Sequence, residues 1–224
     1  MKTKIKKVDA ANPEAEILAQ AAKLIKKGEI IVCPTDTGYA FASNALDTSA
    51  VTKVFQLKGR NFSNPIHIAV SSVAMAEDYA VFNEAAHFLA THYLPGALTI
   101  VLPKKGTVPS ILVGGLTSVG IRIPANNVIL KLSEMSGVPL TATSANASGK
   151  PSTYAVEEVI AQFGENMQKV AMVLDQGPIK LREVSTIVDL SVTPPQLIRQ
   201  GRLGWVTIRE QVNMFYHEKE ENKE

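Results

Sequence analysis

The chain of 224 residues contains a single cysteine, Cys33. One thiol cannot form an internal disulfide and offers no cysteine cluster for a structural metal, so we expect folding in a reducing compartment, the cytoplasm. Long apolar runs are also missing, because no stretch reaches the roughly 18 residues that a membrane span needs. The lysine-rich start is not followed by the apolar segment of a secretion signal. These absences predict a cytoplasmic protein without membrane contact.

Several common functional motifs are absent as well. The sequence has no GxxxxGK[ST] loop and no GxGxxG after a predicted strand, so neither standard nucleotide-binding fold is indicated. It also lacks the GxSxG elbow of serine hydrolases. Its four histidines are scattered and predict no protein metal site. The net charge of +2 is too small to indicate, by itself, a nucleic-acid-binding protein.

The composition is that of a folded domain. Hydrophobic residues make up 46% of the chain and charged residues 20%. Helical and extended patterns alternate without a repeat or a linker, which predicts one α/β (α+β) domain over residues 1–210 around a twisted, mostly mixed sheet. The last twelve residues contain four Glu and two Lys and few apolar groups. We therefore expect a flexible acidic tail at 211–224.

The expected elements follow from the spacing of apolar residues. Helical spacing predicts helices over 13–28, 49–57, 73–93 with a break at 79–83, 127–136 and 156–163. Short β-branched runs predict strands at 29–33, 66–70, 98–102, 119–123, 140–142, 170–174, 186–190 and 196–199. Pro34 is expected to end the first strand and to begin a loop.

Polar loops stand at the predicted strand ends. The segment 141–153, TATSANASGKPST, is rich in hydroxyl and amide side chains, which favour turns over regular structure. Similar loops occur at 34–39, 58–65 and 119–124. Ligands of open α/β sheets bind at strand ends. Cations that bind phosphate and neutral hydrogen-bonding groups are both present in these loops, namely Lys58, Arg60, Arg122, Thr35, Thr37, Ser144, Asn146 and Ser152. This inventory predicts a site for a polyanion such as a nucleotide.

Seven short motifs occur in a fixed order. They are PTDTGY (34–39), KGR (58–60), PGALT (95–99), VGIRIP (119–124), TSANASG (143–149), STIVD (185–189) and IRQG (198–201). Together they resemble the YrdC/YciO family over about residues 28–202, in its short form without an extra C-terminal domain. The resemblance implies a twisted sheet flanked by helices, whose concave, basic face holds ATP and L-threonine.

The family resemblance also implies an activity. The best-known members are nucleotidyltransferases that make L-threonylcarbamoyl-adenylate from L-threonine, bicarbonate and ATP, releasing pyrophosphate. Mg²⁺ would accompany ATP, with few dedicated protein ligands. Partner transferases then carry the threonylcarbamoyl group to tRNA. The reaction develops charge on the phosphate oxygens, so positioned cations matter more than a covalent nucleophile.

The resemblance assigns roles to individual residues. Lys58 and Arg60 would stabilise charge at the reacting phosphate. ATP contacts are implied for Arg60, Asn64, Ser118, Ser144, Asn146, Ser152 and Arg199. Threonine contacts are implied for Thr35, Thr37, His67, Arg122, Ala142 (through its backbone) and Ser185.

The sequence departs from the family pattern at a few positions. Ala69 stands where family members have a histidine, but His67 would share its strand face and is the candidate substitute. Asn126 and Val184 replace a frequent His and Glu. These changes leave open a YciO-like paralogue that binds double-stranded RNA and has weak or no synthase activity. A carbamoyl-transfer enzyme is a third reading.

Overall fold

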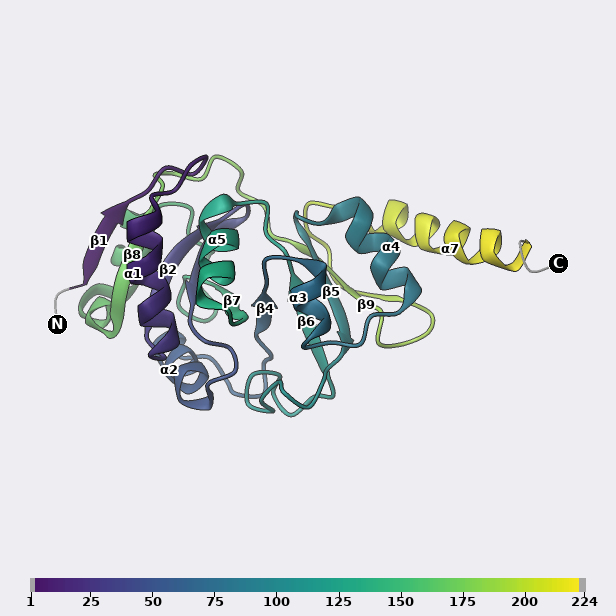
Figure 1. Ribbon diagram of the computed structural model, residues 1–224, viewed down its shortest axis with the longest axis horizontal. Coiled ribbons are helices and arrows are strands. Elements are labelled where there is room, and N and C mark those ends of the chain that lie inside the picture. Colours follow the sequence, from purple (N-terminus) through teal and green to yellow (C-terminus); the bar gives the residue numbers. More distant parts are fainter. Residues whose placement is uncertain (1–2, 222–224) are drawn as a thin grey trace.

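One large sheet organises the molecule. The computed structural model describes residues 3–221, with side chains to residue 216. Within this part, ten strands form a mixed sheet that carries helices on both faces (Figure 1). Across the sheet the strands are β1 (Lys4–Lys7), β8 (Val170–Asp175), β2 (Ile30–Thr35), β3 (Gly38–Ala42), β7 (Leu140–Ser144), β4 (His67–Ala69), β6 (Ser118–Arg122), β5 (Leu98–Pro103), β9 (Thr186–Asp189) and β10 (Gln196–Arg199).

The helices divide between the two faces. They are α1 (Ala15–Lys26), α2 (Thr48–Lys58), α3 (Val73–Glu77), α4 (Glu84–Tyr93), α5 (Asn127–Ser136), α6 (Val156–Phe163) and α7 (Trp205–Glu221), with a 3₁₀ turn η1 (Gly164–Lys169). Helices α1 and α5 lie side by side over one face (Figure 1) and share a core with that face of the sheet. Helices α2, α4 and α6 contribute to the core on the other face. The predicted single mixed α/β domain is confirmed.

Strand β2 shows why the sheet is covered on both sides. Ile30 and Val32 belong to the core under α2 and α6, whereas Ile31 and Cys33 belong to the core under α1 and α5. Successive side chains of a strand point to opposite faces, so a continuous apolar run is buried twice. Each face therefore has its own apolar core.

Helix ends set the loops that carry the polar motifs. Asp47 caps α2 by accepting a hydrogen bond from the Ser49 amide at 2.8 Å, and Gly59 ends the helix in the left-handed conformation, φ 59°. Asn126 caps α5 through the Val128 amide at 3.0 Å. Cap side chains and a terminal glycine satisfy the free backbone groups of a helix end. The KGR motif thus begins at a firmly terminated helix.

The first strand is longer than predicted. Instead of opening a loop, Pro34 lies within β2 and pairs with Tyr39 of β3, a strand that was not predicted. Beyond Val32, β2 has no pairing residue on β8, so the missing N–H of proline costs no ladder hydrogen bond. The PTDTGY motif is therefore a tight hairpin with Asp36 and Thr37 at its tip.

Elsewhere the structure corrects some of the predicted elements and agrees with others. Strand β1 was not predicted, and segment 73–93 forms two helices, α3 and α4, which agrees with the expected break. Residues 211–221, predicted to belong to a flexible tail, are helical. Ile208 and Val212 are buried one turn apart, so α7 packs its apolar stripe against the domain. Residues 222–224 lie outside the described part. Within that part, no helix combines the length and apolarity needed to cross a bilayer.

Candidate functional site

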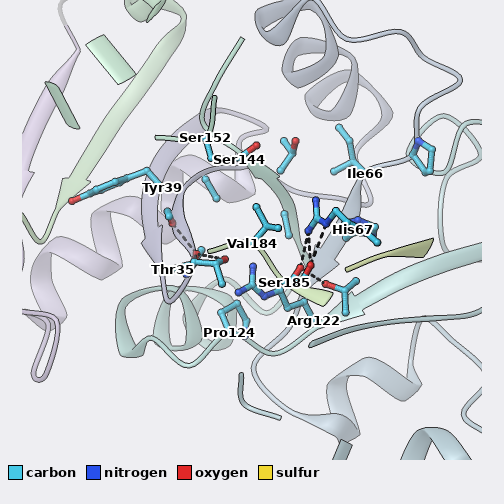
Figure 2. A pocket seen from close by; sticks show the side chains of 18 of the residues that line it. Thr35, Tyr39, Ile66, His67, Arg122, Pro124, Ser144, Ser152, Val184 and Ser185 are labelled. Atoms are coloured by element: carbon cyan, nitrogen blue, oxygen red, sulfur yellow. Dashed lines mark hydrogen bonds between the residues drawn. The ribbon is translucent and has the colours of Figure 1, made fainter. Parts of the chain in front are cut away.

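A cavity lies on the face of the sheet that α1 and α5 cover only in part. On β2, Thr35 follows Cys33 by two positions and therefore faces the same side, but beyond the helices. On β6, Gly120 and Arg122 take that face while Val119 and Ile121 enter the opposite core. The residues on the uncovered part of this face are therefore small or polar, and they form the floor of the cavity (Figure 2).

Most residues predicted to bind ligands come together here. The cavity is lined by Thr35, Thr37, Arg60, His67, Arg122, Ala142, Ser144, Ser152, Ser185 and Arg199. Figure 2 places Thr35, Val184, Ser185 and Arg122 around its middle. The segments that supply these side chains are far apart in sequence, so the cavity is a product of the sheet topology. The concave basic face implied by the family resemblance stays a prediction.

Four predicted residues are not among those that line it: Lys58, Asn64, Ser118 and Asn146. Asn64 is exposed on the loop after α2, and its carbonyl accepts a hydrogen bond from Arg60 at 3.1 Å. Ser118 begins β6 opposite Pro103, at the strand end farthest from Arg122. These two side chains stay candidates only for ligand groups that extend beyond the cavity.

Lys58 lies beneath the Ser/Asn loop instead of facing the cavity. It is 3% exposed, and its Nζ donates to the carbonyls of Ser144 and Asn146, the latter at 2.7 Å. Burial, reinforced by the charge of Arg60, lowers the pKa of Lys58 to about 7. The predicted direct role at the phosphate does not fit this geometry. Lys58 fixes the backbone of the loop whose Ser144 side chain lines the cavity.

Asn146 completes this support from within the loop. Its Oδ1 accepts a hydrogen bond from the Ser144 hydroxyl, and its Nδ2 donates to the Ala147 and Lys150 carbonyls at 2.9 and 2.6 Å. The amide is thus engaged on both sides, which suits the organisation of a turn. Asn146 therefore orients Ser144, and the loop is preorganised without a ligand.

Three of the cavity-lining residues are arginines, and they differ in depth and in partners. Arg122 is 9% exposed and pairs with Asp36 through Nη2 and Oδ1 at 2.7 Å. Arg60 donates to the Asn64 and Pro65 carbonyls at 3.1 and 2.9 Å. Arg199, at the exposed edge strand β10, donates to the Ser185 carbonyl and hydroxyl at 2.9 and 3.0 Å. A carboxylate compensates the first charge, whereas neutral oxygens hold the other two.

His67 lies between these arginines. Burial, together with the charges of Arg199, Arg60 and Arg122, lowers the pKa of His67 to about 3. A Cβ at Gly120 would stand 2.0 Å from His67 Nδ1, so the imidazole occupies space that only glycine leaves free. Ala69, two residues on, is buried under α1 and α5. His67 is therefore the histidine of this strand that reaches the cavity, and it is neutral at physiological pH.

Some residues of the site were missed by the sequence reasoning. Asp36 was quoted within PTDTGY but given no role, and its partner Arg122 is 86 positions away. Thr99 also lines the cavity, and its hydroxyl is hydrogen-bonded to the Ser185 hydroxyl with 3.0 Å between the two oxygens. It lies in the quoted PGALT motif. Asn126, noted as a departure, caps α5 and donates to Gln176 at 2.8 Å, which accounts for its side chain without a ligand. The motifs contained the signal, but the long-range partners did not follow from them.

The described side chains were compared with the usual metal-ligand sets. Among them no group of three or more His, Cys, Asp and Glu could hold an ion. Asp36, the carboxylate beside the cavity, is engaged with Arg122. A divalent cation here would depend on ligands that a phosphate substrate brings with it.

Comparison with known proteins places the chain among relatives. A family model named for Sua5, YciO and YrdC and described as "Telomere recombination" matches residues 23–201. The chain is 41% identical over 184 residues to a threonylcarbamoyl-AMP synthase of Pyrococcus abyssi, covering 82% of this chain and 53% of that protein. It is 39% identical to a putative threonylcarbamoyl-AMP synthase of Methanocaldococcus jannaschii, covering 90% and 94% of the two chains. It thus spans about half the length of the first relative and nearly all of the second.

Comparison with solved structures points to the same family. The chain matches P. abyssi Sua5 complexed with L-threonine with a TM-score of 0.88 and 39% identity, over 94% of this chain and 61% of that one. It matches E. coli YciO with a TM-score of 0.82 over 92% and 99% of the chains, and at 24% identity this likeness concerns the fold alone. The family resemblance read from the seven motifs is confirmed.

Proposed function

We propose that this chain, which belongs to the Sua5/YciO/YrdC family, is a nucleotidyltransferase that makes L-threonylcarbamoyl-adenylate from L-threonine, bicarbonate and ATP. The observation that carries the proposal is the cavity itself, which combines arginines with different charge compensation and several hydroxyl groups. Such a site suits a polyphosphate and an amino acid bound together. The names of the relatives point to the same reaction.

The ATP end of the cavity is assigned to Arg60, Arg199, Ser144 and Ser152. Arg60 and Arg199 have neutral partners, so their positive charges are available to phosphate oxygens. Ser144, oriented by Asn146 over Lys58, adds a short neutral donor. A preorganised loop of this kind stabilises developing charge without reorganising during the reaction.

The threonine end is assigned to the hairpin tip and the centre of the floor. Thr35 lines it from the end of β2, Thr37 from the hairpin tip, Arg122 from β6 and Ser185 from the residue before β9. The Ala142 backbone lies opposite His67 in the sheet. A relative has been solved with L-threonine, which supports this amino acid as the ligand.

The proposed reaction has two steps. The neutral threonine nitrogen attacks the carbon of CO₂, formed from bicarbonate, giving a carbamate and releasing a proton. A carbamate oxygen then attacks the α-phosphorus of ATP, and the bond to the leaving pyrophosphate breaks. Arg60 and Arg199 would stabilise the charge that develops on the phosphate oxygens. Neutral His67 would place a hydrogen-bonding group between the ligands without adding a fourth positive charge.

Cofactor and partners follow from the reaction. Mg²⁺, bound to ATP, would neutralise part of the phosphate charge, with ATP oxygens and water as its main ligands. The adenylate is a mixed anhydride that must be consumed by a transferase, and tRNA modification in the cytoplasm is the expected destination.

Product analysis tests the proposal. Purified protein with ATP, Mg²⁺, bicarbonate and L-threonine should release pyrophosphate and form a product with the mass of threonylcarbamoyl-adenylate. Omission of either threonine or bicarbonate should abolish both signals. Pyrophosphate release that is independent of threonine would overturn the assignment.

The RNA-binding alternative predicts a different result. Arg122 is buried and pairs with Asp36, a geometry that favours a small ligand over a phosphate backbone. Backbone binding to duplex RNA should weaken steeply with added salt. Salt-sensitive RNA binding, together with absence of the adenylate, would make the YciO-like reading the better one.

A further inference from the structure

Asp36 occupies a fixed position at the tip of the β2–β3 hairpin. Thr35 and Gly38 are paired across the hairpin, and the Thr35 hydroxyl accepts from the Thr37 amide at 3.1 Å and donates to the Gly38 carbonyl at 2.7 Å. These bonds hold the two-residue tip. The Asp36 carboxylate reaches Arg122 on β6, although β7 and β4 lie between β3 and β6 in the sheet. The hairpin tip is therefore held against the part of the cavity that Arg122 lines.

The ion pair distinguishes the proposed threonine end, which contains Arg122, from the proposed ATP end, which contains Arg60 and Arg199. Arg60 and Arg199 donate to carbonyl and hydroxyl oxygens, so their charges are not cancelled. Arg122 faces a carboxylate at 2.7 Å, and the two side chains are only 11% and 13% exposed. In such a poorly solvated place their charges largely cancel. The proposed ATP end therefore carries two uncompensated charges, and the proposed threonine end is close to neutral.

The neutral end retains an unused donor. Arg122 Nε is buried and has no hydrogen-bond partner among the described residues. A buried donor without a partner is costly and rare in folded proteins. Arg122 lines the cavity, so its guanidinium would bind a ligand carboxylate, and Asp36 would supply the negative charge that an ammonium group needs nearby. The pair thus matches both charges of a zwitterion.

We propose that Asp36 is a positioning and specificity-determining residue, which reserves the Arg122 end of the cavity for the amino-acid zwitterion and keeps phosphate groups at the Arg60 and Arg199 end. The inference rests on the proposed function, since it deepens the assignment of the amino-acid subsite. Without Asp36, three uncompensated guanidiniums would attract polyphosphate to the whole cavity and repel an ammonium.

The test compares L-threonine with (2S,3R)-2,3-dihydroxybutanoate, which has a hydroxyl in place of the amine. Calorimetry should show that the wild-type protein binds threonine at least about tenfold more tightly than this analogue. Asp36→Asn should weaken threonine binding by at least about tenfold and leave the analogue unchanged or tighter. Inorganic pyrophosphate should compete with threonine in Asp36→Asn but not in the wild type.

Controls separate positioning from folding. Asp36→Glu keeps the charge and should restore most of the preference for threonine. If the Asn variant does not fold, the wild-type comparison carries the test, and equal binding of threonine and of the analogue by the wild type would overturn the inference. Asp78→Asn, an exposed carboxylate outside the cavity lining, should bind both ligands as the wild type does. Equal weakening of threonine and of the analogue in Asp36→Asn would overturn the inference, as would unchanged binding of both.

The outcome is independent of the proposed reaction. Adenylate formation by the wild type with an unchanged ligand preference in Asp36→Asn would refute the role of Asp36 and leave the function standing. Threonine binding that depends on Asp36, without adenylate formation, would support the subsite and refute the proposed reaction.

Discussion

The arginines at the two proposed ends of the cavity differ in their hydrogen-bond and ion-pair partners. Arg60 and Arg199 are held by carbonyl oxygens and keep their charge, whereas Arg122 is buried and neutralised by Asp36. The difference lies in the partner and not in the arginine. We propose that this charge compensation lets one cavity bind a polyanion and a zwitterion side by side.

Loss of Arg122 should have the largest effect, and on stability. Arg122→Met leaves the Asp36 carboxylate poorly solvated and unpaired, so the free energy of unfolding should fall by about 3–5 kcal/mol. Arg199→Met, whose partner is a neutral oxygen, should cost only about 1 kcal/mol. Urea unfolding of both variants measures the difference. The double variant Arg122→Met/Asp36→Asn should recover much of the loss, and equal costs for the two single variants would remove the contrast between the ends.

Loss of Arg60 should affect turnover more than folding. Arg60→Ala removes an uncompensated charge from the proposed ATP end, so kcat/KM for ATP should fall roughly 100-fold. The apparent KM for threonine should change little. Steady-state kinetics with each substrate varied in turn checks the split, and Arg60→Lys keeps the charge but not the forked geometry. Normal kinetics in Arg60→Ala would remove the phosphate assignment.

His67 makes stability depend on pH. The pKa of His67 is about 3 in the folded protein and about 6.5 in an unfolded chain. Between these values only the unfolded state takes up the proton, so the free energy of unfolding should fall as pH is lowered from 6.5 toward 3. The slope from this group is at most about 1.4 kcal/mol per pH unit. Unfolding measured from pH 6.5 to 4.5 should show a shallower slope for His67→Gln. Identical slopes would mean that His67 is protonated in the fold.

Ser144 should give the smallest effect. Ser144→Ala removes one neutral donor of the preorganised loop, so ATP affinity should fall about fivefold, the equivalent of roughly 1 kcal/mol. Threonine affinity should be unaffected, because Ser144 is assigned to the proposed ATP end. Calorimetry with a non-hydrolysable ATP analogue measures both. An equal loss of threonine affinity would indicate that ATP and threonine do not occupy separate ends of the cavity.

Local patterns predicted the parts of the fold that depend on local physics. The β-branched run at 29–33 predicted a strand, which is part of β2, and helix 127–136 was predicted with the bounds it has. Strand β1 has only exposed side chains and forms because it pairs with β8, about 168 positions away. No pattern within Lys4–Lys7 indicates that partner.

The candidate site likewise has features that local patterns predicted and features that depend on distant partners. The motifs identified most of the cavity-lining residues, because loops at strand ends gather at one place in this topology. They did not show that Lys58 points under the Ser/Asn loop, since this depends on where α2 ends relative to β7. Nor did they pair Asp36 with Arg122, because a buried ion pair across intervening strands is a property of the folded sheet.

A crystal structure with L-threonine and a non-hydrolysable ATP analogue would show which arginine binds which ligand. We expect phosphate oxygens on Arg60 and Arg199, and the threonine carboxylate on Arg122 with its ammonium toward Asp36. Phosphate bound to Arg122, or threonine bound away from the hairpin tip, would contradict it.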